Sequence, residues 1–215
     1  MRQLVIDTAT EALSVALFTD DTLTASHHEI AGRGHAEKLI PIIADLPEGG
    51  RADRVVVNRG PGSFTGVRVG IAAARALGYA WDAPVAAYST LALLAAMARD
   101  ENEGEEALHI AIHGGHGELF WQIFDRETLH PRQAVRSSPI MELAAMLEGR
   151  TVHGTGGPAL IQAGCVCDAA ISHPDARLLP LLPAQHLQID LGPLYGRGAD
   201  AVPLQPPRDQ PCSRS

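Results

Sequence analysis

A glycine-rich loop between a β-branched run and a long alanine-rich stretch constrains this chain more than any other feature. Val55-Val56-Val57 is typical of a strand buried on both faces. The stretch from Phe64 to Ala80 lacks proline and predicts a helix. The loop between them, Arg59-Gly60-Pro61-Gly62-Ser63-Phe64-Thr65-Gly66, therefore leads into a helix N-terminus, where exposed N–H groups can bind an anion.

The residues of this loop exclude two common phosphate motifs. The loop lacks the lysine and the spacing of a P-loop, and it does not fit the dinucleotide pattern of three glycines followed by a distant acid. An anion site and a tight connection from strand to helix both remain open.

The periodicity of apolar residues predicts two units. The first, residues 1–100, opens as an antiparallel meander and continues with strands and helices in alternation. The second, residues 107–200, repeats this plan in shorter form, and the proline-rich residues 201–215 are expected to be a disordered tail. The predicted strands are Gln3–Asp7, Leu13–Thr19, Thr22–Glu29, Arg54–Asn58, Val85–Tyr88, Leu108–His113, Glu118–Phe124 and Thr151–His153, and the predicted helices are Gly34–Leu46, Phe64–Ala80, Ser89–Arg99, Pro139–Gly149 and Pro158–Ala163.

Charge and cysteine usage narrow the class of protein. The formal net charge of −8 opposes unassisted binding to a nucleic-acid backbone. The three cysteines, Cys165, Cys167 and Cys212, cannot complete a disulfide framework, and the N-terminus has no apolar run long enough for a secretory signal. No stretch reaches the ~20 apolar residues of a membrane span. We therefore expect a cytoplasmic protein.

Two further segments carry polar chemistry. Asp7, Thr8 and Thr10 form a turn between the first two strands that offers a carboxylate and two hydroxyls to a phosphate and its metal ion. The alternative is ordinary turn chemistry, in which these side chains bond nearby backbone groups. The second segment, Gly154-Thr155-Gly156-Gly157, precedes a predicted helical turn and could face the same ligand from the other unit.

The histidines and cysteines do not predict a metal site. His109 and His113 are four residues apart in an alternating segment, which separates their side chains by about 13 Å on a strand. His113 and His116 flank two glycines and could meet in a loop. Apart from Glu118, however, no carboxylate or cysteine lies at a ligand spacing that would complete a metal site. Cys165 and Cys167 are separated by one residue rather than the usual two, so we expect small, partly buried thiols and no bound metal.

Several segments together resemble the TsaB (YeaZ) family of bacterial tRNA-modification proteins. The resemblance rests on Ile6–Ala12 with Ser14–Leu17, on Gly34-His35-Ala36-Glu37, on Tyr88–Leu91, on Pro193–Arg197 and above all on Arg59–Gly70. The long glycine motif is specific to the family, whereas the opening Asp-Thr element is shared with the paralogue TsaD and with actin-like ATPases.

The resemblance implies an α/β protein with an actin-like, ribonuclease-H-like two-lobe fold, in which a five-stranded first lobe precedes a reduced second lobe. It also implies a non-catalytic scaffold that binds and supports a TsaD-like protein, which forms threonylcarbamoyladenosine on tRNA next to the anticodon. A TsaE-like ATPase would join through that complex, a homodimer would form in isolation, and tRNA would be contacted only indirectly. No cofactor is expected, and nucleotide would bind only within the complex. Asp7, Thr8 and Thr10 would then be remnants of a phosphate loop.

Helices Gly34–Leu46 and Phe64–Ala80 are the expected partner or dimer surface. If they pack side by side, their leftover apolar residues can form a four-helix interface with a like pair. The alternative is that these residues cover the sheet of their own lobe. The residues in question are Leu39, Ile43, Val67, Ile71 and Ala74.

Two departures from the family pattern concern the second unit. His113-Gly114-Gly115-His116 stands where many members have Asp-Ala-Arg, and Pro183–Gly192 is short for the usual late helix. The second lobe is therefore expected to be trimmed or loosely packed. An active actin-like ATPase or small-molecule kinase is the alternative function, and a metallopeptidase is a third.

Overall fold

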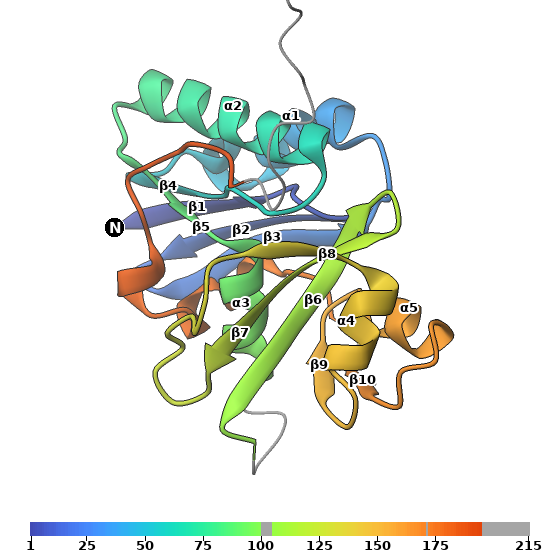
Figure 1. Cartoon of the computed structure of the whole chain (residues 1–215). Coiled ribbons are helices and arrows are strands. Elements are labelled where there is room, and N and C mark those ends of the chain that lie inside the picture. The colour runs from blue at the N-terminus through green and yellow to red at the C-terminus, as the bar shows by residue number, and fades with distance from the viewer. Residues whose placement is uncertain (100–104, 171, 195–215) are drawn as a thin grey trace, which may run out of the picture.

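The computed structural model describes residues 1–99, 105–170 and 172–194. Two five-stranded sheets share one buried helix between them, and further helices cover their outer faces (Figure 1). The expected α/β class and the five-stranded first lobe are confirmed.

The first sheet has the strand order β3-β2-β1-β4-β5. Its antiparallel part is the predicted meander, and β4 and β5 then add in parallel next to β1. The strands are β1 (Arg2–Asp7), β2 (Ala12–Thr19), β3 (Thr22–Ile30), β4 (Arg54–Asn58) and β5 (Val85–Tyr88).

The second sheet has the order β10-β9-β6-β7-β8. Its centre is the antiparallel pair β6 and β7, with β9 added in parallel to β6. The short edge strands β8 and β10 were not predicted from the sequence, because each has too few residues for a detectable alternation. The strands are β6 (Ala107–Gly115), β7 (Glu118–Asp125), β8 (Arg136–Pro139), β9 (Thr151–His153) and β10 (Asp168–Ala170).

Helices α1 (His35–Asp45) and α2 (Phe64–Trp81) cover one face of the first sheet (Figure 1). Helix α3 (Thr90–Ala98) covers the other face and also packs against β6 and β7, so it is buried on all sides. This position explains why its sequence is apolar throughout. Helices α4 (Ile140–Met146) and α5 (Gly157–Gln162) cover the outer face of the second sheet.

The last part of the described chain returns to the first lobe. After the short helix η2 (Ala176–Leu181), the backbone of Gln188 exchanges two 2.8 Å hydrogen bonds with Ala87 in β5. The Leu194 N–H then donates to the Arg59 carbonyl at 2.8 Å. In place of a late α-helix, residues 183–192 form only the turn η3 (Ala184–His186).

The second lobe has its own core between its sheet and helices α4 and α5, so the described residues do not show the expected loose packing. Residues 195–215, which hold the expected tail and part of the Pro193–Arg197 signature, lie outside the described residues, as do residues 100–104 at the expected boundary. No helix in the described ranges is long and apolar enough to cross a membrane.

Candidate functional site: the Asp7 turn and the glycine loop

Asp7 lies at the carboxyl end of β1 and is fully buried. The Asn58 side-chain amide and the Tyr88 hydroxyl both donate to its Oδ2 at 2.7 Å. Its Oδ1 accepts from the Ala9 N–H at 3.1 Å. Both oxygens of the carboxylate are therefore bonded to groups of the protein itself.

Burial dominates the electrostatics of this carboxylate. It raises the pKa of Asp7 from 3.8 to about 6, although the hydrogen bonds from Asn58, Tyr88 and Ala9 lower it. Burial and the nearby Asp7 charge raise the pKa of Tyr88 well above its ordinary value, so Tyr88 remains a hydrogen-bond donor.

The glycine loop packs directly on the Asp7 turn. A β-carbon at Gly62 would lie 2.0 Å from the Ala9 carbonyl oxygen, and one at Gly66 would lie 2.1 Å from that of Thr8. At Gly70 it would lie 2.5 Å from the Thr8 hydroxyl. These three glycines are thus required by the close approach of α2 to the turn.

The start of α2 uses its hydrogen-bond donors on this turn and on its own cap. The Ser63 N–H donates to the Ala9 carbonyl at 2.7 Å, and the Ser63 hydroxyl accepts from the Gly66 N–H at 3.2 Å. The Thr8 hydroxyl in turn donates to the Gly66 carbonyl at 2.7 Å. The loop is therefore a tight connection that packs on the turn, and the N–H groups of Ser63 and Gly66 are used there and at the helix cap.

The remaining polar groups of the loop join it to α3 and to the end of the described chain. The Gly60 N–H donates to Asn58 Oδ1 at 2.7 Å, and the Thr90 hydroxyl lies 2.7 Å from the Pro61 carbonyl oxygen. The Arg59 guanidinium pairs with Asp190 at 2.9 Å. Phe64 and Thr65 are exposed, and the Arg68 guanidinium lies 3.4 Å from the Phe64 ring centre.

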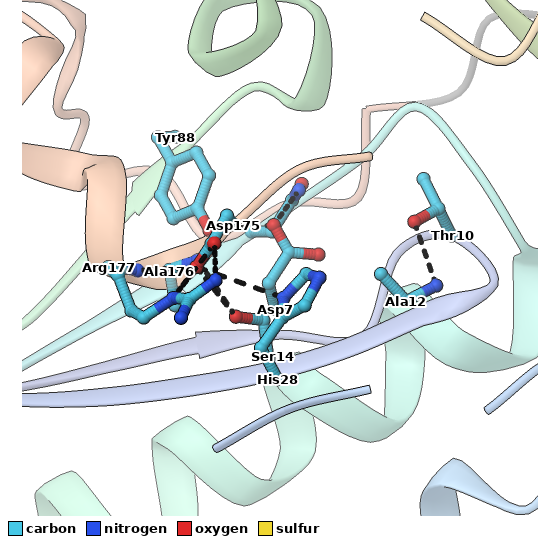
Figure 2. Close-up of polar contacts among 10 residues, drawn as sticks. Asp7, Thr10, Ala12, Ser14, His28, Tyr88, Asp175, Ala176 and Arg177 are labelled. Atoms are coloured by element: carbon cyan, nitrogen blue, oxygen red, sulfur yellow. Dashed lines mark hydrogen bonds and ion pairs between the residues drawn. The ribbon is translucent and has the colours of Figure 1, made fainter. Parts of the chain in front are cut away.

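Asp7 and Thr8 are consequently too buried to meet a phosphate in this conformation. Thr10 stands apart at the turn, where its hydroxyl accepts from the Ala12 N–H at 3.2 Å (Figure 2). The three residues thus form the bonded turn of the alternative interpretation.

A second polar cluster lies next to Asp7 and was missed at the sequence level. Asp175 is buried and accepts from Ser14 at 3.3 Å and from the backbone and side chain of Arg177, with His28 Nδ1 at 3.8 Å (Figure 2). Its members are up to 163 residues apart in sequence, from Ser14 to Arg177. Strand β2 is buried on both faces from Ala12 to Phe18, and Ser14 is a polar residue within this apolar run, which was the available signal.

The glycines 154–157 also serve packing. A β-carbon at Gly154 would lie 2.5 Å from the Ala111 carbonyl oxygen, and one at Gly157 would lie 2.6 Å from the β-carbon of Ala169. They let the loop pass close over β6 and β10, and a contact of this loop with a nucleotide stays a prediction.

The predicted partner residues belong to the core of the first lobe. Leu39, Ile43, Val67, Ile71 and Ala74 are at most 4% exposed and pack between the helices and the sheet. The prediction that these side chains form a contact surface is wrong for this conformation, because they cover their own sheet.

The outer face of the same two helices remains open. It presents two rows at helical spacing, Ala36, Ile40 and Ala44 on α1 and Ala72, Ala76 and Ala80 on α2. Ile40 is 50% exposed although it is a large apolar residue. Ile40, Ala44 and Ala72 each directly follow a predicted residue, which rotates them by about 100° round the helix to the exposed side, where α1 and α2 can meet another helix pair.

Among the described residues, no three histidine, cysteine or acidic side chains are grouped so that they could hold a metal ion. His109 is buried on β6 and His113 is exposed near its end. Burial lowers the pKa of His109.

Comparisons with known proteins were consistent with one another. The family model described as "TsaD: tRNA N6-adenosine threonylcarbamoyltransferase" matches residues 24–143, which is more than half of the chain. The Escherichia coli K12 protein named tRNA threonylcarbamoyladenosine biosynthesis protein TsaB is 39% identical over 132 residues, or 59% of this chain and 56% of that protein. The Bacillus subtilis protein of the same name is 35% identical over 46% of this chain and 45% of its own length. The chain thus matches about half the length of these relatives.

Solved structures match over a larger part of the chain. YeaZ from Pseudomonas aeruginosa superposes with a TM-score of 0.74 at 29% identity, covering 90% of this chain and 99% of that one. A second crystal structure, described as an uncharacterized protein with similarity to peptidase YEAZ from Pseudomonas aeruginosa, gives a TM-score of 0.73 at 30% identity over 91% and 99%.

The fold is therefore the actin-like two-lobe α/β class with a reduced second lobe, here with its turn at Asp7 filled by the protein's own glycine loop. The chain belongs to the TsaB (YeaZ) family, within the wider group that the TsaD model describes.

Proposed function

We propose that this protein is a non-catalytic scaffold that binds a TsaD-like protein and supports it in forming threonylcarbamoyladenosine on tRNA. The observation that carries the proposal is the exposed outer face of α1 and α2 in a chain of this family. Alanines at every fourth position allow another helix pair to approach closely, and Ile40 supplies an apolar contact at the centre of the α1 row.

The filled turn supports a role without catalysis. A phosphate at the Asp7 turn would have to displace the bonds from Asn58, Tyr88 and Ala9, and it would overlap the α2 entrance at Gly62 and Gly66. The alternative function as an ATPase or small-molecule kinase requires those changes. Any nucleotide would then be held within the complex and mainly by other subunits.

The same face would serve a homodimer when the partner is absent, so the two assemblies would compete. A TsaE-like ATPase would join through the TsaD-like subunit. Because the chain carries a net charge of −8, tRNA would be bound by other subunits and contacted here only indirectly. Such a complex would work in the cytoplasm.

The test is size-exclusion chromatography with light scattering on this protein mixed with the TsaD-like protein of the same organism. Ile40→Glu should prevent the mixed complex, because it places a charge in an apolar contact. Ile161→Glu is the matched control, since Ile161 is 48% exposed but lies on α5 in the other lobe.

A mixed complex that forms equally with both variants would exclude the α1–α2 face. Absence of any complex, with or without ATP, would count against the scaffold role. Hydrolysis of ATP by the isolated chain that is lost in Asp7→Asn would favour the ATPase alternative.

A further inference from the structure

Charged side chains border the exposed outer face of α1 and α2, and their signs differ between the two helices. The charged residues of α2 are Arg68 and Arg75, and both are exposed. On α1, the exposed acidic residues Glu37 and Asp45 each directly follow an alanine of the exposed row. The α1–α2 face therefore combines an acidic helix with a basic one.

Lys38 is also exposed on α1, but its charge is balanced by a neighbouring strand. Its ammonium group donates to Glu29 Oε1 on β3 at 3.0 Å. Strand β3 is the edge of the sheet on the α1 side, whereas α2 packs on β4. The charge that α1 presents to a helix pair docked on the α1–α2 face is therefore negative.

The charges repeat at matching intervals along the two helices. The helices lie side by side and run in the same direction, because α1 follows β3, α2 follows β4, and both strands end at the edge of the sheet where β1 ends (Figure 1). Asp45 lies eight residues after Glu37, and Arg75 lies seven residues after Arg68. At the rise of an α-helix these separations are about 12 Å and about 10.5 Å.

A second copy of the chain can place its own helix pair on this face in two symmetric ways. If the two-fold axis runs along the helices, α1 of each copy lies on α2 of the other, and every residue keeps its position along the axis. If the axis runs across the helices, α1 lies on α1 and α2 lies on α2. The first arrangement brings carboxylates to arginines twice, whereas the second brings like charges together.

We propose that the α1–α2 face binds a second copy of this chain with α1 of each copy on α2 of the other. Asp45 of one copy then faces Arg75 of the other, and Glu37 faces Arg68. The alanine rows and Ile40 form the apolar centre of the contact, and the charges at its border select the arrangement. The choice of face rests on the proposed function, and the charge pattern adds that any other partner must present basic groups to α1 and acidic groups to α2.

The test is sedimentation equilibrium of the full-length protein alone, which gives the dissociation constant of the dimer. Asp45→Arg and Arg75→Glu should each weaken the dimer by about tenfold, because each change opposes like charges twice across the two-fold axis. The double variant that carries both changes should regain the wild-type affinity. Added salt should weaken the wild-type dimer, because it screens attraction between the charges.

Arg150→Glu is the matched control, because Arg150 is exposed in the second lobe and its reversal should leave the dimer unchanged. Circular dichroism verifies that each variant is folded. Single variants that dimerise like the wild type, a double variant that stays weak, a wild-type dimer that tightens with salt, or a protein that stays monomeric would each overturn the arrangement.

Ile40→Glu separates this inference from the proposed function. Loss of both the homodimer and the mixed complex in Ile40→Glu, with a homodimer that ignores the charge changes, would overturn the arrangement alone. If neither complex responds to Ile40→Glu, the face itself is excluded, and the proposed function of that face fails with it.

Discussion

Asp7 and Asp175 are two buried carboxylates on the same side of the first sheet that respond to their surroundings in opposite directions. Asp7 accepts hydrogen bonds only from neutral groups, so burial prevails and raises its pKa to about 6. Burial also acts to raise the pKa of Asp175, but hydrogen bonds from Arg177 and the nearby His28 hold it below its ordinary value. The positively charged Arg177 beside Asp175 therefore decides the direction in which the pKa of that carboxylate shifts.

Ionised Asp7 should therefore weaken the fold. Between pH 4 and pH 6 the folded state retains a proton that the unfolded state has released, so stability falls as the pH rises through this window. The shift from 3.8 to about 6 corresponds to at most roughly 3 kcal/mol. Asp7→Asn lacks this titration. The free energy of unfolding of the wild type, relative to that of the variant, should therefore decrease from pH 4 to pH 7.

Urea unfolding of both proteins at pH 4, 5, 6 and 7 measures this difference. The contributions of the other carboxylates to the pH dependence are the same in both proteins and cancel. A difference that does not change with pH would show that Asp7 titrates normally.

At the scale of secondary-structure elements, the contact between the glycine loop and the Asp7 turn determines how closely α2 approaches β1. Gly66→Ala places a β-carbon 2.1 Å from the Thr8 carbonyl oxygen, and backbone rather than a flexible side chain must move. Overpacking of this kind costs about 1–3 kcal/mol or more, even though alanine has the better helix propensity.

Thermal and urea unfolding of Gly66→Ala should show this loss. Thr65→Ala, at the exposed neighbouring position of α2, should change stability by less than about 0.5 kcal/mol. A Gly66→Ala protein as stable as the wild type would mean that α2 does not need this close approach.

The elements that sequence analysis predicted well are those with strong local signals. Strand β4 has the predicted bounds, and α2 starts at the predicted residue. A β-branched run marks the strand, and a glycine loop marks the start of the helix. The short strands β8 and β10 depend on pairing with neighbouring strands and leave no such pattern. The same distinction applies to the site: glycines signalled a close approach, but the sequence could not identify Thr8 and Ala9 as what they approach.

At the scale of the whole molecule, two connections join the end of the described chain to the first sheet. One is the Arg59–Asp190 pair with the Gln188–Ala87 backbone bonds at the edge of the sheet. The other is Asp175, which precedes η2 and contacts β2 through Ser14, while the Ala176 N–H donates to the Ser14 hydroxyl at 2.9 Å. The second is buried, so it should contribute more to holding the two lobes together.

Asp175→Asn should test that connection, since it keeps the size of the side chain and removes the charge that Arg177 binds. Losing charge-assisted hydrogen bonds at a buried position costs about 1–3 kcal/mol. The pKa of Asp175 is lowered in the folded state. The stabilisation by its ionised carboxylate is therefore present at neutral pH and is lost as the pH falls through the folded-state pKa. Urea unfolding at pH 7 and pH 3 should thus show a larger effect of the variant at the higher pH than at the lower, the reverse of the trend for Asp7. A double-mutant cycle with Ser14→Ala should give a coupling above 0.5 kcal/mol if the two side chains act together. Purely additive effects would mean that Asp175 only orders its own turn with Arg177, and that the lobes are held together by the apolar contacts of α3.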